Sequence, residues 1–154
     1  MIAVIQRVNS AQVFADGEPA GSIGRGLYIL LGVMKGDERR DAELLAEKIC
    51  KLRIFCDEND KMNLSVTDVS GQILTVSNFT LGANYAHGNR PDYFGAAAPT
   101  EANELYEYFL ELIAARMGEA PAGVFGADMR TEMSTDGPVT IVMNSEMLKR
   151  GKNQ

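Results

Sequence analysis

Histidine and cysteine, the usual ligands of zinc, are scarce in this 154-residue chain. His87 is the single histidine, so sites that need several histidines are excluded, and its setting in a loop favours a solvated side chain over a catalyst. Cys50 and Cys56 form neither a CxxC pair nor a zinc-binding set, and we interpret them as free thiols in a reducing compartment. We therefore expect no metal and no cofactor.

Long apolar runs and an excess of positive charge are also missing. No stretch of about 18 apolar residues and no cationic, apolar leader occurs, so we expect a soluble cytoplasmic protein. The net charge of −6 argues against broad binding to a nucleic-acid backbone, and any RNA contact must be local. The basic groups available for such a contact are Arg7, Lys51, Arg53, Arg90 and the tail residues Lys149, Arg150 and Lys152. For the tail we favour a frayed, solvated C-terminus.

The patterns that are present predict one globular domain over residues 1–154 with a sizeable core, since 45% of the residues are hydrophobic. Alternating or short apolar runs predict strands at residues 2–8, 11–14, 18–23, 27–33, 52–56, 72–79, 129–134 and 139–143. Helical spacing predicts one helix over residues 38–51 and another that Thr100 caps and Gly118 ends. The order of elements predicts an α+β fold with mixed or antiparallel sheets and two main helices.

Two short blocks stand out from this background. Residues 72–81 read as a strand that ends in Ser-Asn-Phe-Thr-Leu, and the long loop 82–98 that follows has the length of a functional loop. Residues 135–140 read Thr-Asp-Gly-Pro-Val-Thr between two strand patterns, where proline is unusual because it cannot donate to a ladder. The cis form of an X-Pro bond costs only about 0.5–1 kcal/mol. A rigid cis turn that aims two carbonyls in one direction and a plain hairpin turn are both open interpretations.

Together the two blocks resemble the paired signatures of the D-aminoacyl-tRNA deacylases, the D-tyrosyl-tRNA deacylase family, which read Ser-Gln-Phe-Thr-Leu and Asn-x-Gly-Pro-Val-Thr. Further segments that match the pattern of the family are residues 3–8, 21–26, 52–55, 61–65, 90–91 and 123–129. The chain departs from the signatures at Asn78, where the family has glutamine, and at Thr135, where it has asparagine.

The resemblance implies a deacylase-type fold and a homodimer in which the Gly-cisPro loop of each subunit enters the active site of the other. The implied reaction is hydrolysis of the ester of D-aminoacyl-tRNA to free D-amino acid and tRNA, with glycyl-tRNA mischarged on tRNA-Ala as a further substrate. The implied partner is the 3' end of the aminoacyl-tRNA. Gly137 and Pro138 are implied to reject L-aminoacyl-tRNA by steric clash, with Arg7 packed on the loop to hold its orientation.

By the same resemblance, Ser77, Asn78, Phe79 and Thr80 form the catalytic strand end. Backbone N–H groups near Phe79 and Thr80 can stabilise the developing oxyanion, while Thr80 places the ester and the 2'-hydroxyl of the substrate helps to activate water. Two alternatives stay open. Thr80 can be a nucleophile, although no base lies beside it in the sequence, and the hydroxyls of this block can simply face solvent.

Phe125 and Met129 resemble the positions of a pocket for the terminal adenine, and core packing is the alternative for both. Two rival functions also remain. One is a related editing deacylase that acts on L-aminoacyl mischarged tRNA, in which the Gly-Pro bond is trans; Arg7 argues against it, while Asn78 and Thr135 are compatible with it. The other is a non-hydrolytic protein that binds aminoacyl-tRNA, since Asn78 is one methylene shorter than glutamine.

Overall fold

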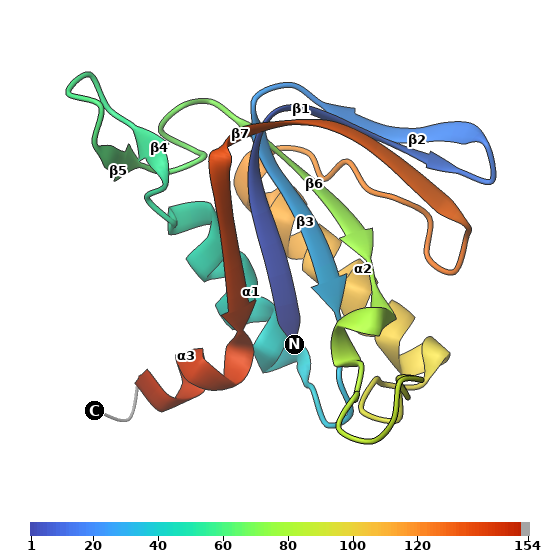
Figure 1. The fold of residues 1–154 in the computed structure, drawn as a ribbon. Coiled ribbons are helices and arrows are strands. Elements are labelled where there is room, and N and C mark those ends of the chain that lie inside the picture. Colours follow the sequence, from blue (N-terminus) through green and yellow to red (C-terminus); the bar gives the residue numbers. More distant parts are fainter. Residues whose placement is uncertain (152–154) are drawn as a thin grey trace.

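The computed structural model describes residues 1–151, which form a curled sheet with two long helices packed against one of its faces (Figure 1). The strands are β1 (Ile2–Ala15), β2 (Glu18–Ile23), β3 (Gly26–Gly32), β4 (Phe55–Cys56), β5 (Met62–Leu64), β6 (Gln72–Ser77) and β7 (Met129–Asn144). The helices are α1 (Arg39–Lys51), α2 (Pro99–Met117) and α3 (Ser145–Gly151), and a 3-10 turn, η1 (Phe79–Gly82), follows β6. The predicted α+β class is confirmed, with the short helix α3 in addition to the two main helices.

The long strand β1 organises the sheet. On one side it pairs along its whole length with β7, and on the other side its first half pairs with β3 and its second half with β2, all antiparallel. Strand β6 then pairs with β3 in the parallel direction, which makes the sheet mixed. Strand β3 is buried on both faces, as its continuous apolar run predicts.

The larger core lies between the sheet and the helices. Leu45 and Ile49 of α1 and Phe109 and Ile113 of α2 are fully buried against it. Burial of each such side chain contributes about 1.5–3 kcal/mol. The apolar side chains that the sequence pattern places on one side of each helix therefore hold α1 and α2 against this face of the sheet. Gly118, with a positive φ of 83°, ends α2 as predicted.

Several predicted boundaries were wrong. Thr100 does not cap α2, because Ala98 is the N-cap and Pro99 takes the first helical position, where its missing N–H costs nothing. The strand predicted at residues 52–56 contains only Phe55 and Cys56, and it pairs with β5, which the sequence pattern missed. The strand predicted at residues 72–79 ends at Ser77, where the chain turns into η1.

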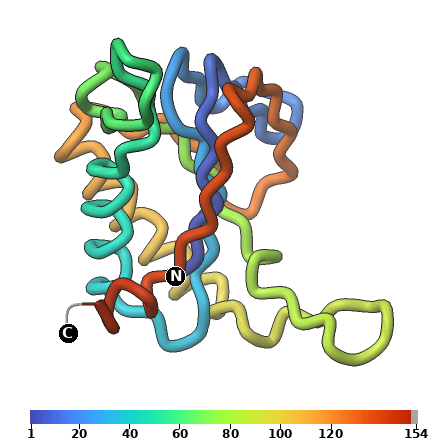
Figure 2. Tube along the Cα trace, turned by 60° about the vertical axis from the view of Figure 1, so that its left-hand side comes forward, coloured from blue at the N-terminus to red at the C-terminus, as the bar shows by residue number. Residues whose placement is uncertain are grey.

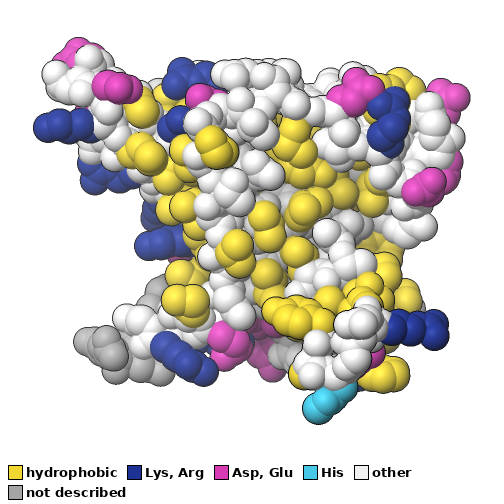
Figure 3. Space-filling model, viewed as in Figure 1, with side chains coloured by type: hydrophobic (Ala, Val, Ile, Leu, Met, Phe, Trp, Pro, Cys, Tyr) yellow, Lys and Arg dark blue, Asp and Glu magenta, His cyan; other side chains and the backbone are white. Residues whose placement is uncertain are grey.

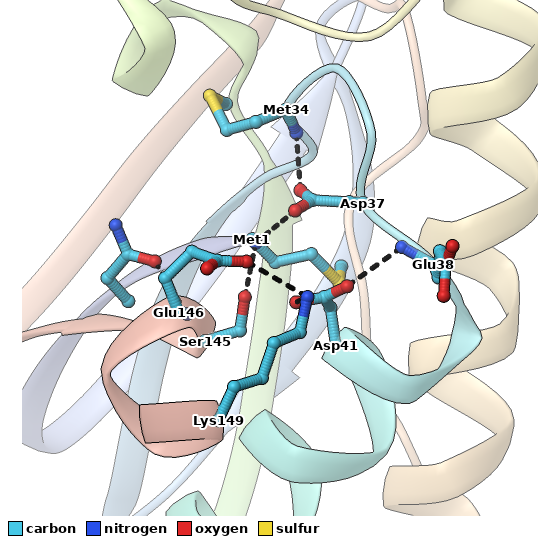
Figure 4. Close-up of polar contacts among 9 residues, drawn as sticks. Met1, Met34, Asp37, Glu38, Asp41, Ser145, Glu146 and Lys149 are labelled. Carbon is cyan, nitrogen blue, oxygen red and sulfur yellow. Dashed lines mark hydrogen bonds and ion pairs between the residues drawn. The ribbon is translucent and has the colours of Figure 1, made fainter. Parts of the chain in front are cut away.

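The interpretation of the tail as frayed was also wrong for Lys149 and Arg150, which lie in α3, whereas Lys152 lies outside the described residues. Figure 4 shows why this helix is held. Lys149 Nζ lies 2.8 Å from Oδ1 of the buried Asp41 of α1 and 2.9 Å from Oε1 of Glu146. Ser145, fully buried at the start of α3, accepts a hydrogen bond of 2.6 Å from the Met1 ammonium.

The Gly-Pro block does not form a hairpin turn. Strand β7 keeps its antiparallel direction along β1 on both sides of the block, with Val8 opposite Thr135 and Gln6 opposite Thr140. The four residues 136–139 therefore lie opposite Arg7 alone, as a wide bulge within one strand.

Among residues 1–151, no helix is long and apolar enough to cross a membrane.

Candidate functional site

A cavity of about 550 Å³ opens between the end of β6, the start of α2 and the segment that leads into β7. Its lining is mostly apolar and consists of Leu31, Val33, Ser77, Asn78, Phe79, Tyr93, Ala96, Ala97, Pro99, Ala102, Tyr106, Phe125, Gly126, Ala127 and Met129. Five residues singled out from the sequence are therefore brought together here: Ser77, Asn78, Phe79, Phe125 and Met129. Apolar pockets with a few convergent polar groups are typical of small-ligand sites.

The end of β6 is shaped by the side chain of Asn78. The Asn78 N–H donates to Leu31 O of β3 at 2.8 Å, which is the last ladder bond of the strand. Asn78 Oδ1 then accepts from the Thr80 N–H at 3.1 Å and also from the Thr80 hydroxyl, and so caps η1. Asparagine is a favoured cap because its short amide reaches the second N–H of the turn.

This cap decides which amide at the strand end is available. Of the two amides expected near the oxyanion, the Thr80 N–H already donates to Asn78 Oδ1. The N–H of Phe79 starts the 3-10 turn, and the first N–H groups of a helical segment have no acceptor within it. Phe79 also lines the cavity, whereas Thr80 is exposed beside it.

Phe125 and Met129 lie in the opposite wall of the cavity, and their positions are compatible with both interpretations made for them, a pocket for the terminal adenine and core packing. The rings of Phe125 and Tyr106 lie 5.9 Å apart, so Phe125 packs on the core and lines the cavity as well. A Cβ on Gly123 would lie 2.5 Å from Met129 Sδ, so the bare backbone of this glycine allows Met129 its place in the wall. Tyr106 donates to Thr75 O at 3.1 Å, and burial raises the pKa of its phenol, which keeps it neutral.

Tyr106 and the cavity wall from Tyr93 to Ala102 were missed in the sequence analysis. The available signals were the aromatic positions in loop 82–98 and the helical stripe of α2, which places Tyr106 one turn before Phe109 and Leu110. The aromatic positions were interpreted only as part of a loop and the stripe only as the signal of a helix, because the pattern does not show that the loop folds back against the helix.

The Gly-Pro bulge and Arg7 lie away from this cavity within the chain. Arg7 is opposite Leu27 of β3, whereas Ser77 at the strand end is opposite Leu31 of the same strand. Four positions along a strand correspond to about 13 Å, and none of Arg7, Gly137 and Pro138 lines the cavity. Figure 1 shows the same separation, with the bend of β7 at the upper end of the sheet and the end of β6 below it.

Arg7 braces the bulge. Its Nε lies 3.0 Å from Asp136 Oδ2 and donates to Asp136 O at 3.3 Å, while its Nη1 donates to Ile54 O at 2.6 Å. The peptide bond between Gly137 and Pro138 is cis, and Pro138 is exposed. Arg7 thus contacts the segment that carries Gly137 and Pro138, as the resemblance to the family implies.

Among residues 1–151, no three side chains of His, Cys, Asp or Glu lie close enough together to hold a metal ion. His87 lies exposed in the loop after η1. The polar side chains in the cavity lining are Ser77, Asn78, Tyr93 and Tyr106, and the Tyr106 hydroxyl is already engaged by Thr75 O.

Residues 4–144 match the family model described as D-Tyr-tRNA(Tyr) deacylase. A D-aminoacyl-tRNA deacylase of Pelobacter propionicus is 51% identical over 143 residues, which are 93% of this chain and 99% of that protein. The D-aminoacyl-tRNA deacylase of Haemophilus influenzae strain PittEE is 51% identical over 144 residues, with 94% of this chain and 99% of that protein covered.

Two solved structures share the fold. The first, titled c-Myc DNA Unwinding Element Binding Protein, has a TM-score of 0.87 at 40% identity and covers 94% of this chain and 98% of its own. The second, titled as a probable eukaryotic D-amino acid tRNA deacylase, has a TM-score of 0.81 at 14% identity over 93% and 98% of the two chains, which indicates the fold alone.

Proposed function

Since this chain belongs to the D-Tyr-tRNA(Tyr) deacylase family, whose curated members are hydrolases of the D-aminoacyl-tRNA ester, we propose that its cavity binds and cleaves this ester. The observation that supports the proposal is that one cavity joins the strand end at Ser77–Phe79 to the wall of Phe125 and Met129. In this proposal the wall binds the terminal adenine, and the strand end meets the ester on its ribose. Since the curated relatives are deacylases, the non-hydrolytic alternative loses support.

In the proposed reaction the protein positions the ester and supplies one hydrogen-bond donor for the oxyanion. The ester carbonyl lies at the strand end, where the Phe79 N–H stabilises the oxyanion as water attacks; loss of one such donor costs about 10²–10³ in rate in other enzymes. The Thr80 hydroxyl is held by Asn78 Oδ1 and orients the ester. The 2'-hydroxyl of the ribose helps to activate the water, since no histidine lines the cavity.

The proposed enzyme is a homodimer in which the Gly-Pro bulge of one subunit completes the cavity of the other. Two observations support this arrangement. The bulge lies about 13 Å along β3 from the strand end of its own chain, and Pro138 is exposed. Strand β7 pairs only with β1 within residues 1–151, so its other edge is open to a second copy. The side chain of Val142 on β7 is also 68% exposed.

Selectivity for D-aminoacyl esters is proposed to be steric. Backbone carbonyls of the bulge, braced by Arg7, would contact the α-ammonium and leave no space for an L side chain, whereas a D side chain points outward. Glycyl-tRNA mischarged on tRNA-Ala has no side chain to be rejected and is proposed as a further substrate. The cytoplasm, where aminoacyl-tRNA is made and used, is the proposed site of action.

The deciding experiment is deacylation of matched D- and L-tyrosyl-tRNA by the purified protein, with glycyl-tRNA alongside. Release of D-tyrosine much faster than L-tyrosine supports the proposal, and the Met147→Ala variant, changed at an exposed position of α3, serves as the unaffected control. Faster release of the L-amino acid would favour the L-editing enzyme. Tight retention of both esters without release would favour a binding protein. A clean 16.8 kDa monomer in sedimentation at micromolar concentration would refute the homodimer.

A further inference from the structure

The loop between η1 and α2 presents aromatic rings to solvent. Tyr85 is 79% exposed and Phe94 is 78% exposed, which are the largest exposures among the large hydrophobic side chains of residues 1–151. Figure 2 shows this segment, coloured yellow-green, projecting from the body of the molecule. Large apolar side chains left exposed on one loop are a candidate interaction site.

These rings continue the cavity of the proposed active site. Phe79 and Tyr93 both line the cavity, and their rings meet edge to face at 5.2 Å. Phe94 directly follows Tyr93, and Tyr85 comes three residues after the end of η1. The cavity lining therefore reaches this loop at Tyr93, and the two exposed rings of Tyr85 and Phe94 belong to the same loop.

The loop is held in place by hydrogen bonds at its base. Asn84 and Asp92 form an antiparallel bridge, with N–H to O distances of 2.8 and 2.9 Å, and Asn84 Nδ2 donates to Asp92 Oδ2 at 2.9 Å. The Phe94 N–H donates to Asp92 Oδ1 at 3.2 Å, and the Lys35 N–H donates to Gly95 O at 2.9 Å. A surface ordered before binding loses less entropy when a ligand arrives.

The charge around the rings suits an anion. Arg90 and His87 are exposed at the tip of the loop and Lys35 at its base. The one acidic side chain of the loop, Asp92, is engaged by Asn84 and by the Phe94 N–H. Figure 3 shows hydrophobic, cationic and histidine side chains together at the lower right, where the loop lies, on a chain whose net charge is −6.

We propose that residues 83–95 form a stacking platform for the unpaired nucleotides that precede the terminal adenosine of the tRNA. Tyr85 and Phe94 stack on the bases, and Arg90 contacts the phosphate between them. Aromatic side chains beside a cation are the usual means of holding a single strand, because every base has a face that can stack. The inference rests on the proposed function and extends it from the terminal adenosine to the nucleotides before it.

Three esters of one D-amino acid test the platform: on adenosine, on the trinucleotide cytidine-cytidine-adenosine and on full tRNA. The platform predicts kcat/KM at least about tenfold higher for the trinucleotide ester than for the adenosine ester, within the range measured for base stacking. The Arg90→Ala variant should weaken the trinucleotide reaction and its dependence on salt while the adenosine ester reacts as before.

Variants at the rings give the sharper comparison. Tyr85→Ala and Phe94→Ala should each lower kcat/KM for the trinucleotide ester about five- to tenfold and leave the adenosine ester unchanged. Tyr85→Phe and Phe94→Tyr keep a flat ring and should restore the rate. Met147→Ala removes another exposed apolar side chain, from α3, outside the cavity lining, and should change neither reaction.

The outcomes separate the two proposals. If none of the three esters is hydrolysed, the proposed function fails. If the adenosine ester is hydrolysed but the trinucleotide ester is no faster and the ring variants have no effect, the platform is overturned while the proposed function stands. An equal loss on both esters, or a change of sedimentation in the ring variants, would also overturn it, because the loop would then support the cavity or a second copy of the chain.

Discussion

The Nε of Arg7 lies 3.0 Å from Oδ2 of Asp136, so a buried guanidinium of β1 is paired with the first residue of the bulge in β7. The other end of the same side chain donates to Ile54 O just before β4. Arg7 thereby ties the proposed selectivity element to two neighbouring segments of its own chain.

Removal of this guanidinium should lower both stability and selectivity. Arg7→Met leaves Ile54 O and Asp136 without their donor, and we expect a loss of about 2–3 kcal/mol in the free energy of unfolding, since Asp136 is only partly buried. The ratio of D- to L-ester hydrolysis should fall, as measured beside urea unfolding. Arg7→Lys keeps the charge but not the planar fork, so it should recover only part of either loss. An unchanged ratio in a destabilised Arg7→Met protein would leave Arg7 a purely structural role.

Gly137→Ala tests the backbone of the bulge. Gly137 has a φ of 127°, and a Cβ there would lie 2.8 Å from Val139 N and 2.9 Å from Val139 Cγ2. We expect a loss of about 2–4 kcal/mol, because the strained φ and the clash add. The control is Gly36→Ala, where φ is also positive but the space is open, and a smaller loss is expected. Thermal unfolding compares the two, and equal losses would show that the clash at Val139 relaxes freely.

Thr80→Ala should slow hydrolysis without abolishing it. The Thr80 hydroxyl orients the ester and bonds to Asn78 Oδ1, but the oxyanion is assigned to the Phe79 amide, so we expect kcat/KM about 10–100-fold lower. Thr80→Ser keeps the hydroxyl and should stay within a few-fold of the original rate. Complete loss in Thr80→Ala, with an acyl-enzyme trapped in the unmodified protein, would instead identify Thr80 as a nucleophile.

Phe125→Leu tests the adenine wall with little change in volume. The variant keeps an apolar side chain against Tyr106 but removes the flat ring, so kcat/KM for the adenosine ester should fall about tenfold as stacking is lost. Met62→Ala, at an exposed position of β5 outside the cavity lining, is the control and should leave the rate unchanged. If both variants react like the original protein, the adenine binds elsewhere.

The pairing of Asp41 with Lys149 should give stability a defined pH dependence. Burial raises the pKa of Asp41, but hydrogen bonds from Lys149, Ser145 and the Glu38 backbone outweigh it and lower the pKa overall; bonds to Asp41 and Glu146 raise the pKa of Lys149. Because the pKa of Asp41 is lowered in the folded protein, the pair stabilises the fold above about pH 4. Because the pKa of Lys149 is raised, this stabilisation persists up to about pH 10. It is lost as the pH falls through the folded pKa of Asp41 or rises through that of Lys149.

Lys149→Met should therefore destabilise the protein most between these limits and least in acid. We expect about 1–2 kcal/mol at pH 7, less than for a fully buried pair because Lys149 is about one-third exposed. Urea unfolding of both proteins across pH 3–9 measures the difference. Arg150→Met, with its exposed side chain on the same helix, is the control, and a loss in Lys149→Met that does not vary with pH would contradict the assignment.

The sequence by itself determined the elements whose signals are local. The stripe of Leu45 and Ile49 placed α1, the apolar run of β3 predicted a strand buried on both faces, and Gly118 marked the end of α2 because a left-handed residue favours glycine. The two signature blocks, read as a resemblance, also pointed to the family to which the chain belongs.

Only the tertiary structure decided how distant segments meet. Nothing local shows that β7 continues along β1 past a proline, since the partner strand lies about 130 positions earlier. The cavity likewise joins Phe79 to Phe125 only because β6, α2 and the segment before β7 pack together, and Asn78 occupies the Thr80 amide only once the strand has ended. Periodicity reports which face of an element is buried, whereas pairing and packing over long sequence separations choose the neighbours that form the site.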